Sequence, residues 1–487
     1  MKVLLCLPPG GYLVDKDELM PAAGLPPLGL ASLAAVLEEA GLAVEVLDAQ
    51  AENLSWPRIR ARLSRTVPEV VGVTFTTESR AGGFRLIREA RRALPAALVL
   101  AGGPHVTFAA KDTLDHIPEL DAVCRGEGEF TLLEAVRARQ EGRDFADVAG
   151  LSWRREGRIV HNPPRPFITD LDALPPPARH RLPLERYAGF TLDLPDRGRT
   201  RFASLMASRG CPVGCCFCSA SAMWGRRFRP RSAAAVVDEV EELVRRHGIG
   251  GIWFFDDSFT MDKDRVHAIC DALLLRNLDL AWYCDSRVDR VEEELLRKMK
   301  RAGCRGISFG VETGSERLLA EVLGKHITLD QVRRVRDLCR TVGLRPRWLF
   351  MVGLPTETRE EAGATLALMA ELGGDSSLGV LKIYPGTKVE RWAREEGILP
   401  ADFSWTDTGK GKAFSMPLVT GDAPLYLDRM TWKDIARILL RYAEMNNYPL
   451  RSRILPALRR VRSPRELLRL LTMGLVYAGH RLGRGAR

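Results

Sequence analysis

SRGCPVGCCFC, residues 208–218, carries three cysteines in the spacing C-x3-C-x2-C, at Cys211, Cys215 and Cys218. Thiolates suit the irons of iron–sulfur clusters, and short spacers let one loop wrap around the metal. Three thiolates hold three irons of a 4Fe-4S cluster and leave the fourth iron open. An electron carrier normally closes its cluster with a fourth cysteine, whereas an enzyme can bind a small chelating molecule at an open iron. The loop therefore predicts an enzyme.

Two other interpretations of the loop compete with this one. A structural zinc site takes four nitrogen or sulfur ligands, commonly from paired motifs. The next candidate in the loop is Cys216, whose side chain we expect to point away from the other three. Three structural cysteines could also gather by accident in a loop rich in glycine and proline. We favour the cluster over both.

The glycine-rich spacer and the aromatic Phe217 make the loop resemble the signature of the radical S-adenosylmethionine (SAM) enzymes. The resemblance implies that the open iron chelates the methionine amino and carboxylate groups of SAM. It also implies that an electron from the cluster cleaves SAM to a 5′-deoxyadenosyl radical. Cys211, Cys215 and Cys218 would then be both the metal ligands and the catalytic residues.

Strand and helix patterns alternate about six times between Arg201 and about residue 400. Each repeat has the length of a βαβ unit, about 30 residues, so the pattern predicts an α/β fold with a partial (β/α)6 barrel. Chemistry in such barrels gathers at the carboxyl ends of the strands. The strands are expected at residues 203–207, 251–255, 281–284, 306–310, 347–352 and 379–383.

The strand ends of this core are polar, and their order matches that of cobalamin-dependent radical SAM enzymes. By that resemblance the backbone of residues 254–257 meets the methionine amino group, Ser286 or Arg287 binds its carboxylate, and Glu312 binds the ribose hydroxyls. A guanidinium forks onto a carboxylate, and a carboxylate accepts two hydroxyl donors. An alternative for Asp257 is a place facing the substrate. The residues expected to bind SAM are Phe217, Asp256, Asp257, Ser286, Arg287, Glu312 and Gly353.

Residues 1–140 alternate short apolar strands with amphipathic helices, which predicts a Rossmann-like parallel sheet with helices on both faces. Ligands of such sheets bind beyond the carboxyl ends of the strands. Those ends are rich in glycine and small hydroxyl residues, which permit close approach of the backbone to a phosphate-bearing ligand. Strands are expected at 3–7, 43–47, 70–75, 97–100 and 122–124, and helices at 28–40, 56–65 and 83–93.

This region resembles the cobalamin-binding domain that precedes many radical SAM cores, through PPLGL (26–30), AGGPH (101–105) and RGEGE (125–129). The D-x-H-x-x-G motif, whose histidine ligates cobalt in other cobalamin proteins, is absent. We therefore expect no protein histidine below the cobalt; His105 is the only candidate to the contrary, and we interpret it as a hydrogen-bonding loop residue. The residues expected to bind cobalamin are Pro9, Thr74, Thr76, Thr77, Gly102, Gly103, His105, Gly126, Glu127 and Gly128. Alternatives for the whole region are a flavodoxin-like module for another nucleotide, or a remnant that binds nothing.

The remaining segments are a linker and a C-terminal region. Residues 141–200 contain a short hairpin and several prolines and are expected to be a proline-rich linker between the 1–140 domain and the 201–400 core. Residues 401–487 are expected to be mainly helical and to cap the barrel mouth with substrate contacts from Trp405, Trp432 and Tyr442. Within them, 448–487 is an arginine-rich tail, and LLRLLTMGLVY (467–477) in it predicts a basic amphipathic helix. Peripheral membrane contact is one role for it; packing on the protein or covering an anionic cofactor are the others.

Composition excludes several classes of protein. The ten cysteines at irregular spacing and the absence of an N-terminal signal region predict a reducing cytoplasm rather than disulfides. No apolar run reaches the roughly 18 residues of a membrane-spanning helix. The formal net charge of +10 is spread over arginine-rich helices, so we interpret it as solvated helix faces rather than a nucleic-acid surface.

Together these features predict a cobalamin-dependent radical SAM enzyme, with a methyltransferase acting on an unactivated carbon as the first hypothesis. The resemblance implies that one SAM methylates the reduced cobalamin and a second supplies the radical. A cyclase or ring-rearranging enzyme with the same cofactors is the second hypothesis, and a non-catalytic cobalamin carrier or sensor with a structural cluster is the third. The expected partners are a small-molecule or lipid-like substrate and an external electron donor such as flavodoxin or ferredoxin.

Overall fold

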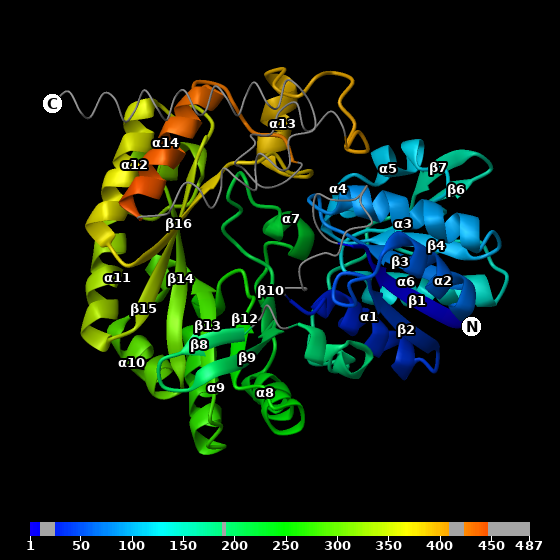
Figure 1. Ribbon diagram of the computed structural model, residues 1–487, viewed down its shortest axis with the longest axis horizontal. Coiled ribbons are helices and arrows are strands. Elements are labelled where there is room, and N and C mark those ends of the chain that lie inside the picture. Colours follow the sequence, from blue (N-terminus) through cyan, green and yellow to red (C-terminus); the bar gives the residue numbers. More distant parts are fainter. Residues whose placement is uncertain (10–24, 188–190, 409–422, 447–487) are drawn as a thin grey trace.

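The computed structural model describes residues 1–9, 25–187, 191–408 and 423–446 (Figure 1). An N-terminal α/β domain, blue to cyan in Figure 1, lies beside a green to yellow partial barrel. The basic segment 448–487 expected to form an amphipathic helix lies outside the described residues. Among the described helices, none combines the length and the apolar character needed to cross a membrane.

The N-terminal sheet has the order β2-β1-β3-β4-β5-β6-β7, and its first five strands are parallel. Both faces are covered: Val3 and Leu5 of β1 belong to one apolar core, and Leu4 and Cys6 belong to the other. Alternate residues of a strand point to opposite faces, so a strand buried on both sides is apolar throughout. The strands are β1 (Lys2–Leu7), β2 (Ala43–Asp48), β3 (Val70–Thr74), β4 (Leu98–Gly102) and β5 (Ala122–Cys124).

Helices α1 and α6 cover one face of this sheet, and α2 and α3 cover the other. Gly41, which follows α1, has a φ of +76°, as expected for a glycine that ends a helix. The helices of the domain are α1 (Leu28–Glu39), α2 (Trp56–Thr66), α3 (Arg80–Ala93), α4 (Pro104–Phe108), α5 (Ala110–His116) and α6 (Gly128–Gln140).

The hairpin of the linker is part of the N-terminal sheet. Its strands β6 (Leu151–Arg155) and β7 (Arg158–His161) add to β5 in antiparallel fashion. Trp153 of β6 is buried against Phe145, with ring centroids 5.5 Å apart. The sheet therefore continues to His161, beyond the boundary at residue 140 that the sequence suggested.

The second sheet has the order β16-β15-β14-β13-β12-β9-β8, with six parallel strands in chain order and an antiparallel β8 at one edge. All six expected strands are present, and the sixth begins at Asp375 rather than Gly379. The strands are β8 (Thr191–Leu194), β9 (Gly198–Leu205), β12 (Gly251–Phe254), β13 (Ala281–Ser286), β14 (Cys304–Glu312), β15 (Arg345–Val352) and β16 (Asp375–Val380).

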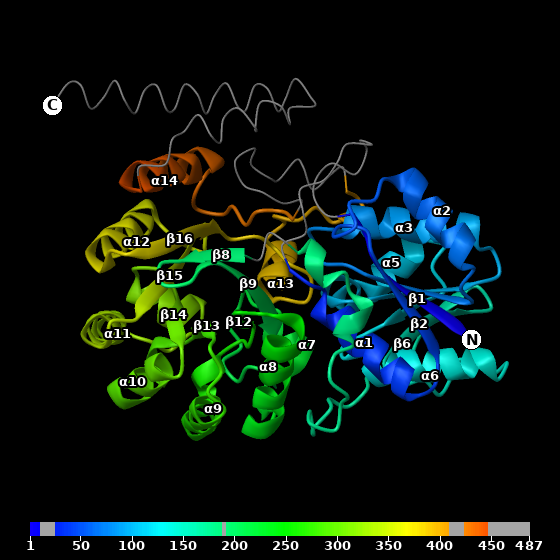
Figure 2. The ribbon, with the colours of Figure 1, turned by 60° about the horizontal axis from the view of Figure 1, so that its bottom comes forward.

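Helices cover the outer face of this partial barrel (Figures 1 and 2). Most begin at a side-chain cap: Thr328 and Thr358 each form a capping box with the residue three positions on. The helices are α8 (Ala233–His247), α9 (Lys263–Leu275), α10 (Glu293–Arg301), α11 (Leu329–Val342) and α12 (Arg359–Leu372), followed by α13 (Lys388–Glu395) and α14 (Trp432–Met445).

Polar contacts join the N-terminal domain to the segments that follow the barrel. Glu78 accepts hydrogen bonds from Lys382 Nζ (2.7 Å) and Tyr384 Oη (2.8 Å). The buried guanidinium of Arg80 donates to the backbone carbonyl of Trp405 (2.9 Å). The backbone N–H of Trp405 donates to the carboxylate of Asp112 (2.9 Å). Trp405 is therefore buried between the two domains, in a loop, rather than on a helix over the barrel mouth.

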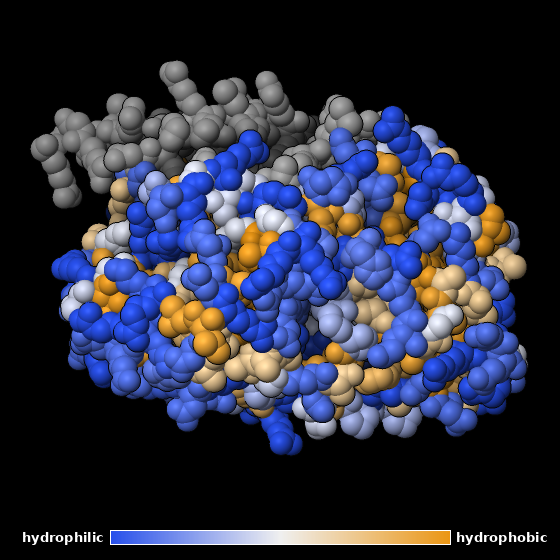
Figure 3. Space-filling view, turned by 90° about the horizontal axis from the view of Figure 1, so that it is seen from below, coloured by the Kyte–Doolittle hydropathy of each residue, from blue (hydrophilic) through white to orange (hydrophobic). Residues whose placement is uncertain are grey.

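Arginines on the outer helices pair with neighbouring carboxylates, as Arg297 does with Glu293 and Arg333 with Glu371. The face in Figure 3 is mostly hydrophilic, with apolar residues in small groups. This arrangement is typical of solvated helix faces.

Candidate active site

The cysteine loop is an excursion between two short paired strands. Strand β10 (Ser208–Arg209) precedes the loop and strand β11 (Arg229–Pro230) follows it, and the two strands pair in antiparallel fashion. The N–H of Cys211 donates to the carbonyl of Gly225 (3.1 Å), which holds the start of the loop against its return. Cys211 and Cys215 are partly buried and Cys218 is exposed, so the three thiols border open space.

Cys216 lies apart from the other three cysteines. Its side chain belongs to the barrel core and is 2% exposed. Its N–H donates to the carbonyl of Leu323 (3.3 Å), and its carbonyl accepts from the N–H of Val389 (3.2 Å). The expectation that Cys216 points away is confirmed. The other six cysteines, Cys6, Cys124, Cys270, Cys284, Cys304 and Cys339, are also buried as expected.

The described residues contain no group of three or more His, Cys, Asp or Glu side chains placed to hold one metal ion. A zinc site needs its ligands to converge on a single point. A cluster takes one thiolate per iron, so its three sulfurs stand further apart. Three thiols from one loop are a donor set that fits a 4Fe-4S cluster, and Cys211, Cys215 and Cys218 are the residues that would hold it.

Three charged side chains near the cysteine loop contact one another, since Lys325 pairs with Glu312 and the carbonyl of Lys325 accepts from Arg287. The carbonyl of Leu323, two residues earlier, accepts from the N–H of Cys216. Burial raises the pKa of the Cys215 thiol, and the charges acting on it come first from Lys325, then from Glu312 and Arg287. Glu312 ends β14 at a register irregularity and has a φ of +75°. A non-glycine residue in that region is strained, and such strain is common at functional sites. The structure thus brings two expected SAM-binding residues to the cysteine loop.

Lys325 is a site residue that the sequence did not reveal. It pairs with Glu312, and the side chains of the two are 7% and 10% exposed. Lys325 lies in a loop after the π-helical turn Leu318–Val322, away from the strand ends. A lone lysine in such a loop carries no local signal, and only the fold places it opposite Glu312.

Several expected SAM-binding side chains already have protein partners. Arg287 donates to both carboxylate oxygens of Asp289 (2.8 and 3.1 Å) and to the carbonyl of Lys325 (2.9 Å). Asp256 accepts from the N–H of Ala207 (3.1 Å) and from the Ser208 hydroxyl. Asp256 therefore ties the end of β12 to the end of β9, and Arg287 fixes the backbone of Lys325.

The remaining expected residues differ in their surroundings. Ser286 is buried and shares a hydrogen bond with Thr260, whereas Asp257 is exposed at the end of β12. Phe217 packs against the barrel core. Gly353, at the end of β15, has a φ of +78° and begins a turn that favours glycine.

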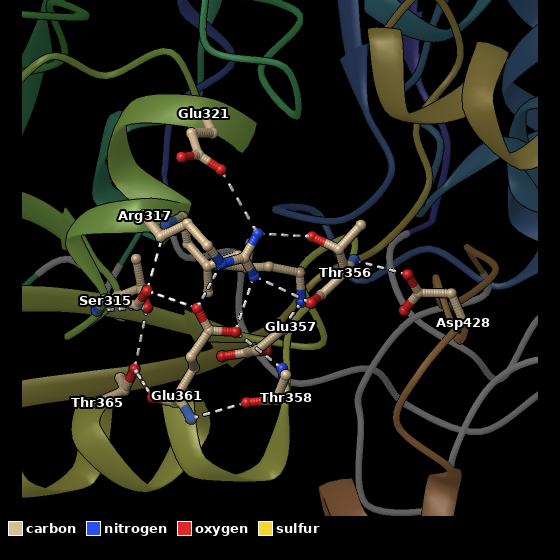
Figure 4. Close-up of polar contacts among 12 residues, drawn as sticks. Ser315, Arg317, Glu321, Thr356, Glu357, Thr358, Glu361, Thr365 and Asp428 are labelled. Atoms are coloured by element: carbon tan, nitrogen blue, oxygen red, sulfur yellow. Dashed lines mark hydrogen bonds and ion pairs between the residues drawn. The ribbon is translucent and has the colours of Figure 1, made fainter.

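Glu357 holds the turn at Gly353. Its Oε2 accepts from the N–H groups of Gly353 (2.6 Å) and Leu354 (3.0 Å), and its Oε1 has no hydrogen-bond partner among the described residues. Figure 4 shows Glu357 beside the Arg317–Glu361 pair, in which Nε and Nη2 donate at 3.0 and 2.9 Å. Burial raises the pKa of Glu357 to about 7. A fully buried carboxyl therefore holds the turn that carries Gly353, one of the residues expected to bind SAM.

Protein stability should fall with rising pH because of Glu357. A carboxyl whose pKa is raised by folding binds its proton more tightly in the native state, so the free energy of unfolding falls as pH rises from the ordinary value of 4.5 to about 7. In Glu357→Gln this part of the pH dependence should disappear. The measurement is the thermal unfolding midpoint of the wild type and of Glu357→Gln across this pH range. Parallel pH profiles for the two proteins would contradict the assignment.

The Lys325–Glu312 pair should behave as a buried ion pair. Lys325→Met should cost about 3–5 kcal/mol in the free energy of unfolding, because Glu312 stays buried without its counter-charge. The double variant Lys325→Met, Glu312→Leu should recover most of that loss. Denaturant unfolding of the single and the double variant measures both free energies. The control is Arg297→Met, which breaks an exposed ion pair on α10 and should cost less than about 1 kcal/mol. No recovery in the double variant would show that the pair is not coupled.

A cavity of about 220 Å³ opens at the carboxyl edge of the N-terminal sheet, between the strands and helices α1 and α6. Six of the expected cobalamin-binding residues line it: Thr74, Gly102, Gly103, Gly126, Glu127 and Gly128. Gly103 has no room for a side chain, since a Cβ there would lie 2.7 Å from Thr74 Oγ1, whereas a Cβ at Gly29 or Gly126 would meet no atom within 4 Å. The cavity is lined mostly by apolar surface and opens partly to solvent, and its volume fits one flat aromatic arm of cobalamin rather than the whole molecule.

The other four expected residues lie outside this cavity wall. His105 is fully buried among Phe75, Phe84 and Trp405, and its Nδ1 shares a hydrogen bond with Thr77 (3.0 Å). Burial lowers its pKa to about 3. Its hydrogen-bond partner is Thr77 rather than Glu127, and its buried place among aromatic rings does not suit a cobalt ligand. Thr76 bonds to Ser79, and the Pro9 carbonyl lies near Gly82.

Two family models match the chain. The radical SAM superfamily matches residues 205–369, and the B12 binding domain matches residues 22–136. The first range contains the cysteine loop, and the second contains most of the residues that line the cavity.

Three relatives extend over most of the chain. An uncharacterized methyltransferase of Pyrococcus horikoshii is 36% identical over 400 residues, which cover 82% of this chain and 84% of that protein. Cytidylyl-2-hydroxyethylphosphonate methyltransferase of Streptomyces wedmorensis is 30% identical over 397 residues, 72% of this chain and 74% of that protein. Anaerobic magnesium-protoporphyrin IX monomethyl ester cyclase of Rubrivivax gelatinosus is 31% identical over 361 residues, 73% of this chain and 63% of that protein.

Two solved structures share the fold. The radical SAM methyltransferase TsrM of Kitasatospora setae, with cobalamin and a 4Fe-4S cluster bound, has a TM-score of 0.66 at 23% identity and covers 80% of this chain and 75% of that one. The cobalamin-dependent radical enzyme OxsB, with aqua-cobalamin and SAM bound, has a TM-score of 0.70 at 17% identity and covers 97% of this chain and 70% of that one. From its motifs, its fold and these relatives, the chain belongs to the radical SAM superfamily, among the members that carry a B12-binding domain.

Proposed function

We propose that this protein is a cobalamin-dependent radical SAM methyltransferase that transfers a methyl group to an unactivated carbon. The observation that carries the proposal is the contact between the two candidate cofactor sites. Helix α7 (Ala220–Trp224) begins two residues after Cys218. Its last two residues, Met223 and Trp224, line the cavity of the N-terminal domain. A methyl carrier and a radical source must act on the same substrate atom, so their sites must adjoin.

The cofactors supply the chemistry: the cluster with SAM provides a carbon radical, and cobalamin provides the methyl group. The chain supplies position and shelter. Cys211, Cys215 and Cys218 would hold the cluster, and Glu312 would bind the ribose hydroxyls with Lys325 holding its carboxylate in place. Asp257, exposed at the end of β12, would face the substrate.

The relatives support methyl transfer as the reaction. Two of those described above are named as methyltransferases, and the hopanoid C-3 methylase of Methylococcus capsulatus is 29% identical over 414 residues. The cyclase of Rubrivivax gelatinosus supports ring formation as the second candidate. The substrate class we propose is a small or lipid-like molecule, and the electron donor is a flavodoxin or ferredoxin. Ten cysteines without a disulfide support a reducing cytoplasm as the location.

The products of SAM separate the two reactions. The protein is reconstituted anaerobically with iron, sulfide and hydroxocobalamin, and is given SAM with a deuterated methyl group and a chemical reductant. A methyltransferase should release both S-adenosylhomocysteine and 5′-deoxyadenosine and leave the labelled methyl on a product. A cyclase should release 5′-deoxyadenosine without transferring the label. Release of neither compound would contradict both enzymes and favour a carrier or sensor.

A further inference from the structure

Glu127 lies between the cavity and the cysteine loop. It belongs to the N-terminal domain, in the turn between β5 and α6, and it lines the cavity. Its side chain is 2% exposed, yet its donors come from outside the domain. Oε1 accepts from Arg209 Nη1 (2.8 Å) and Arg229 Nη1 (2.9 Å), and Oε2 accepts from the N–H of Ile168 (2.7 Å). One carboxylate therefore joins the domain to the linker and the barrel.

Arg209 and Arg229 lie at the two ends of the segment that contains the cysteine loop. They face each other across β10 and β11, so everything between them, residues 210–228, is one closed loop. Arg209 also donates to Glu129 (2.6 Å) and lies over the ring of Trp224 at 5.2 Å. Arg229 donates to the carbonyl of Trp224 (2.6 Å). Both ends of the loop are thus held by the N-terminal domain, and both also contact α7.

The same loop forms part of the cavity wall. Met223 and Trp224 of α7 line the cavity together with Gly126, Glu127 and Gly128. A displacement of the loop would therefore open the wall, and a group that fills the cavity would press against α7. Buried charge-assisted hydrogen bonds are strong, so the loop and the turn that carries Glu127 should move together.

We propose that Glu127 is a positioning residue that couples the two cofactor sites, an inference that rests on the cofactors of the proposed function. With the cluster in place, the loop and α7 complete the cavity wall, and cobalamin binds more tightly. With cobalamin bound, the loop retains its cluster longer. By linkage the two effects on binding are equal in free energy.

The test is a titration with hydroxocobalamin, followed by absorbance, of the full-length protein with its cluster and after the cluster is removed by a chelator. Wild-type protein should bind about tenfold more tightly with the cluster present. In Glu127→Gln this ratio should fall to near one. In Glu129→Gln it should be intermediate, because Arg229 remains held. Cobinamide, which lacks the nucleotide arm, should show no coupling even in the wild type.

The control is Glu134→Gln on the same helix, which removes a carboxylate that pairs with Arg165 of the linker, away from the loop. Its ratio should equal that of the wild type.

The reverse effect is read from the half-life of the cluster in the presence of a chelator. Cobalamin should lengthen this half-life in the wild type and not in Glu127→Gln. Equal affinities with and without the cluster in wild type would overturn the proposal, as would an unchanged ratio in Glu127→Gln. If Glu127→Gln fails to fold, Glu129→Gln and the cobinamide comparison decide. No binding of hydroxocobalamin in any state would contradict the proposed function itself.

Discussion

Replacing Cys215 by alanine should lower the release of 5′-deoxyadenosine by more than about a thousandfold, equivalent to more than about 4 kcal/mol in the activation barrier. Two thiolates hold only two of the irons, so the site that presents an open iron to SAM is lost. No other residue of the loop can replace the ligand, because Cys216 points into the core. Iron and sulfide content and the product yield after anaerobic reconstitution measure the effect.

Cys216→Ala is the matched control for this experiment. It removes a thiol from the same loop, but a thiol that packs in the barrel core and lies apart from the other three. The loss of packing should cost about 1 kcal/mol in stability, while cluster content and 5′-deoxyadenosine release stay within about twofold. A cluster that survives Cys215→Ala, or one that fails in Cys216→Ala, would contradict the assignment of ligands.

Replacing Gly29 by leucine should weaken cobalamin binding by at least about a hundredfold. Gly29 lies in the first turn of α1 and lines the cavity, and a Cβ at this position would meet no atom within 4 Å. The leucine side chain can therefore enter the cavity without displacing protein atoms. It would occupy the space needed by the cofactor arm, and a hundredfold loss corresponds to about 2.7 kcal/mol. Titration with hydroxocobalamin gives the affinity.

Gly29→Ala separates the filling of the cavity from the loss of glycine. Alanine raises helix propensity by about 1 kcal/mol and leaves most of the cavity free, so binding should change by less than about threefold. Unfolding of Gly29→Leu should occur at a temperature no lower than in wild type. Tight binding of hydroxocobalamin by Gly29→Leu would show that the cofactor arm lies elsewhere.

The parts of the fold that are encoded locally could be predicted from the sequence. The six barrel strands follow from apolar runs separated by amphipathic helices, and α1 and α2 match their predicted bounds to within one residue. The burial of both faces of β1 follows from its unbroken apolar run. The cysteine spacing is also local, so both the likeness to radical SAM enzymes and the separate place of Cys216 could be inferred.

Contacts between distant segments could not be predicted in this way. Lys325 meets Glu312 only because the turn Leu318–Val322 directs the chain back over the barrel. Glu127 was expected to contact cobalamin, and it does line the cavity, but its hydrogen bonds go to Arg209 and Arg229, more than eighty residues along the chain. Such long-range pairing leaves no pattern in a single sequence.

The hairpin β6–β7 has a practical consequence for isolating the N-terminal domain. A fragment cut at residue 140 would lack both strands and leave the backbone N–H and C=O groups of β5 unpaired along one side. Unpaired sheet edges recruit strands from other molecules and cause aggregation. Residues up to Tyr187 also pack on this domain, where the Tyr187 hydroxyl donates to Asp48 (2.8 Å). An independently folding cobalamin module of this chain therefore has to extend to about that tyrosine.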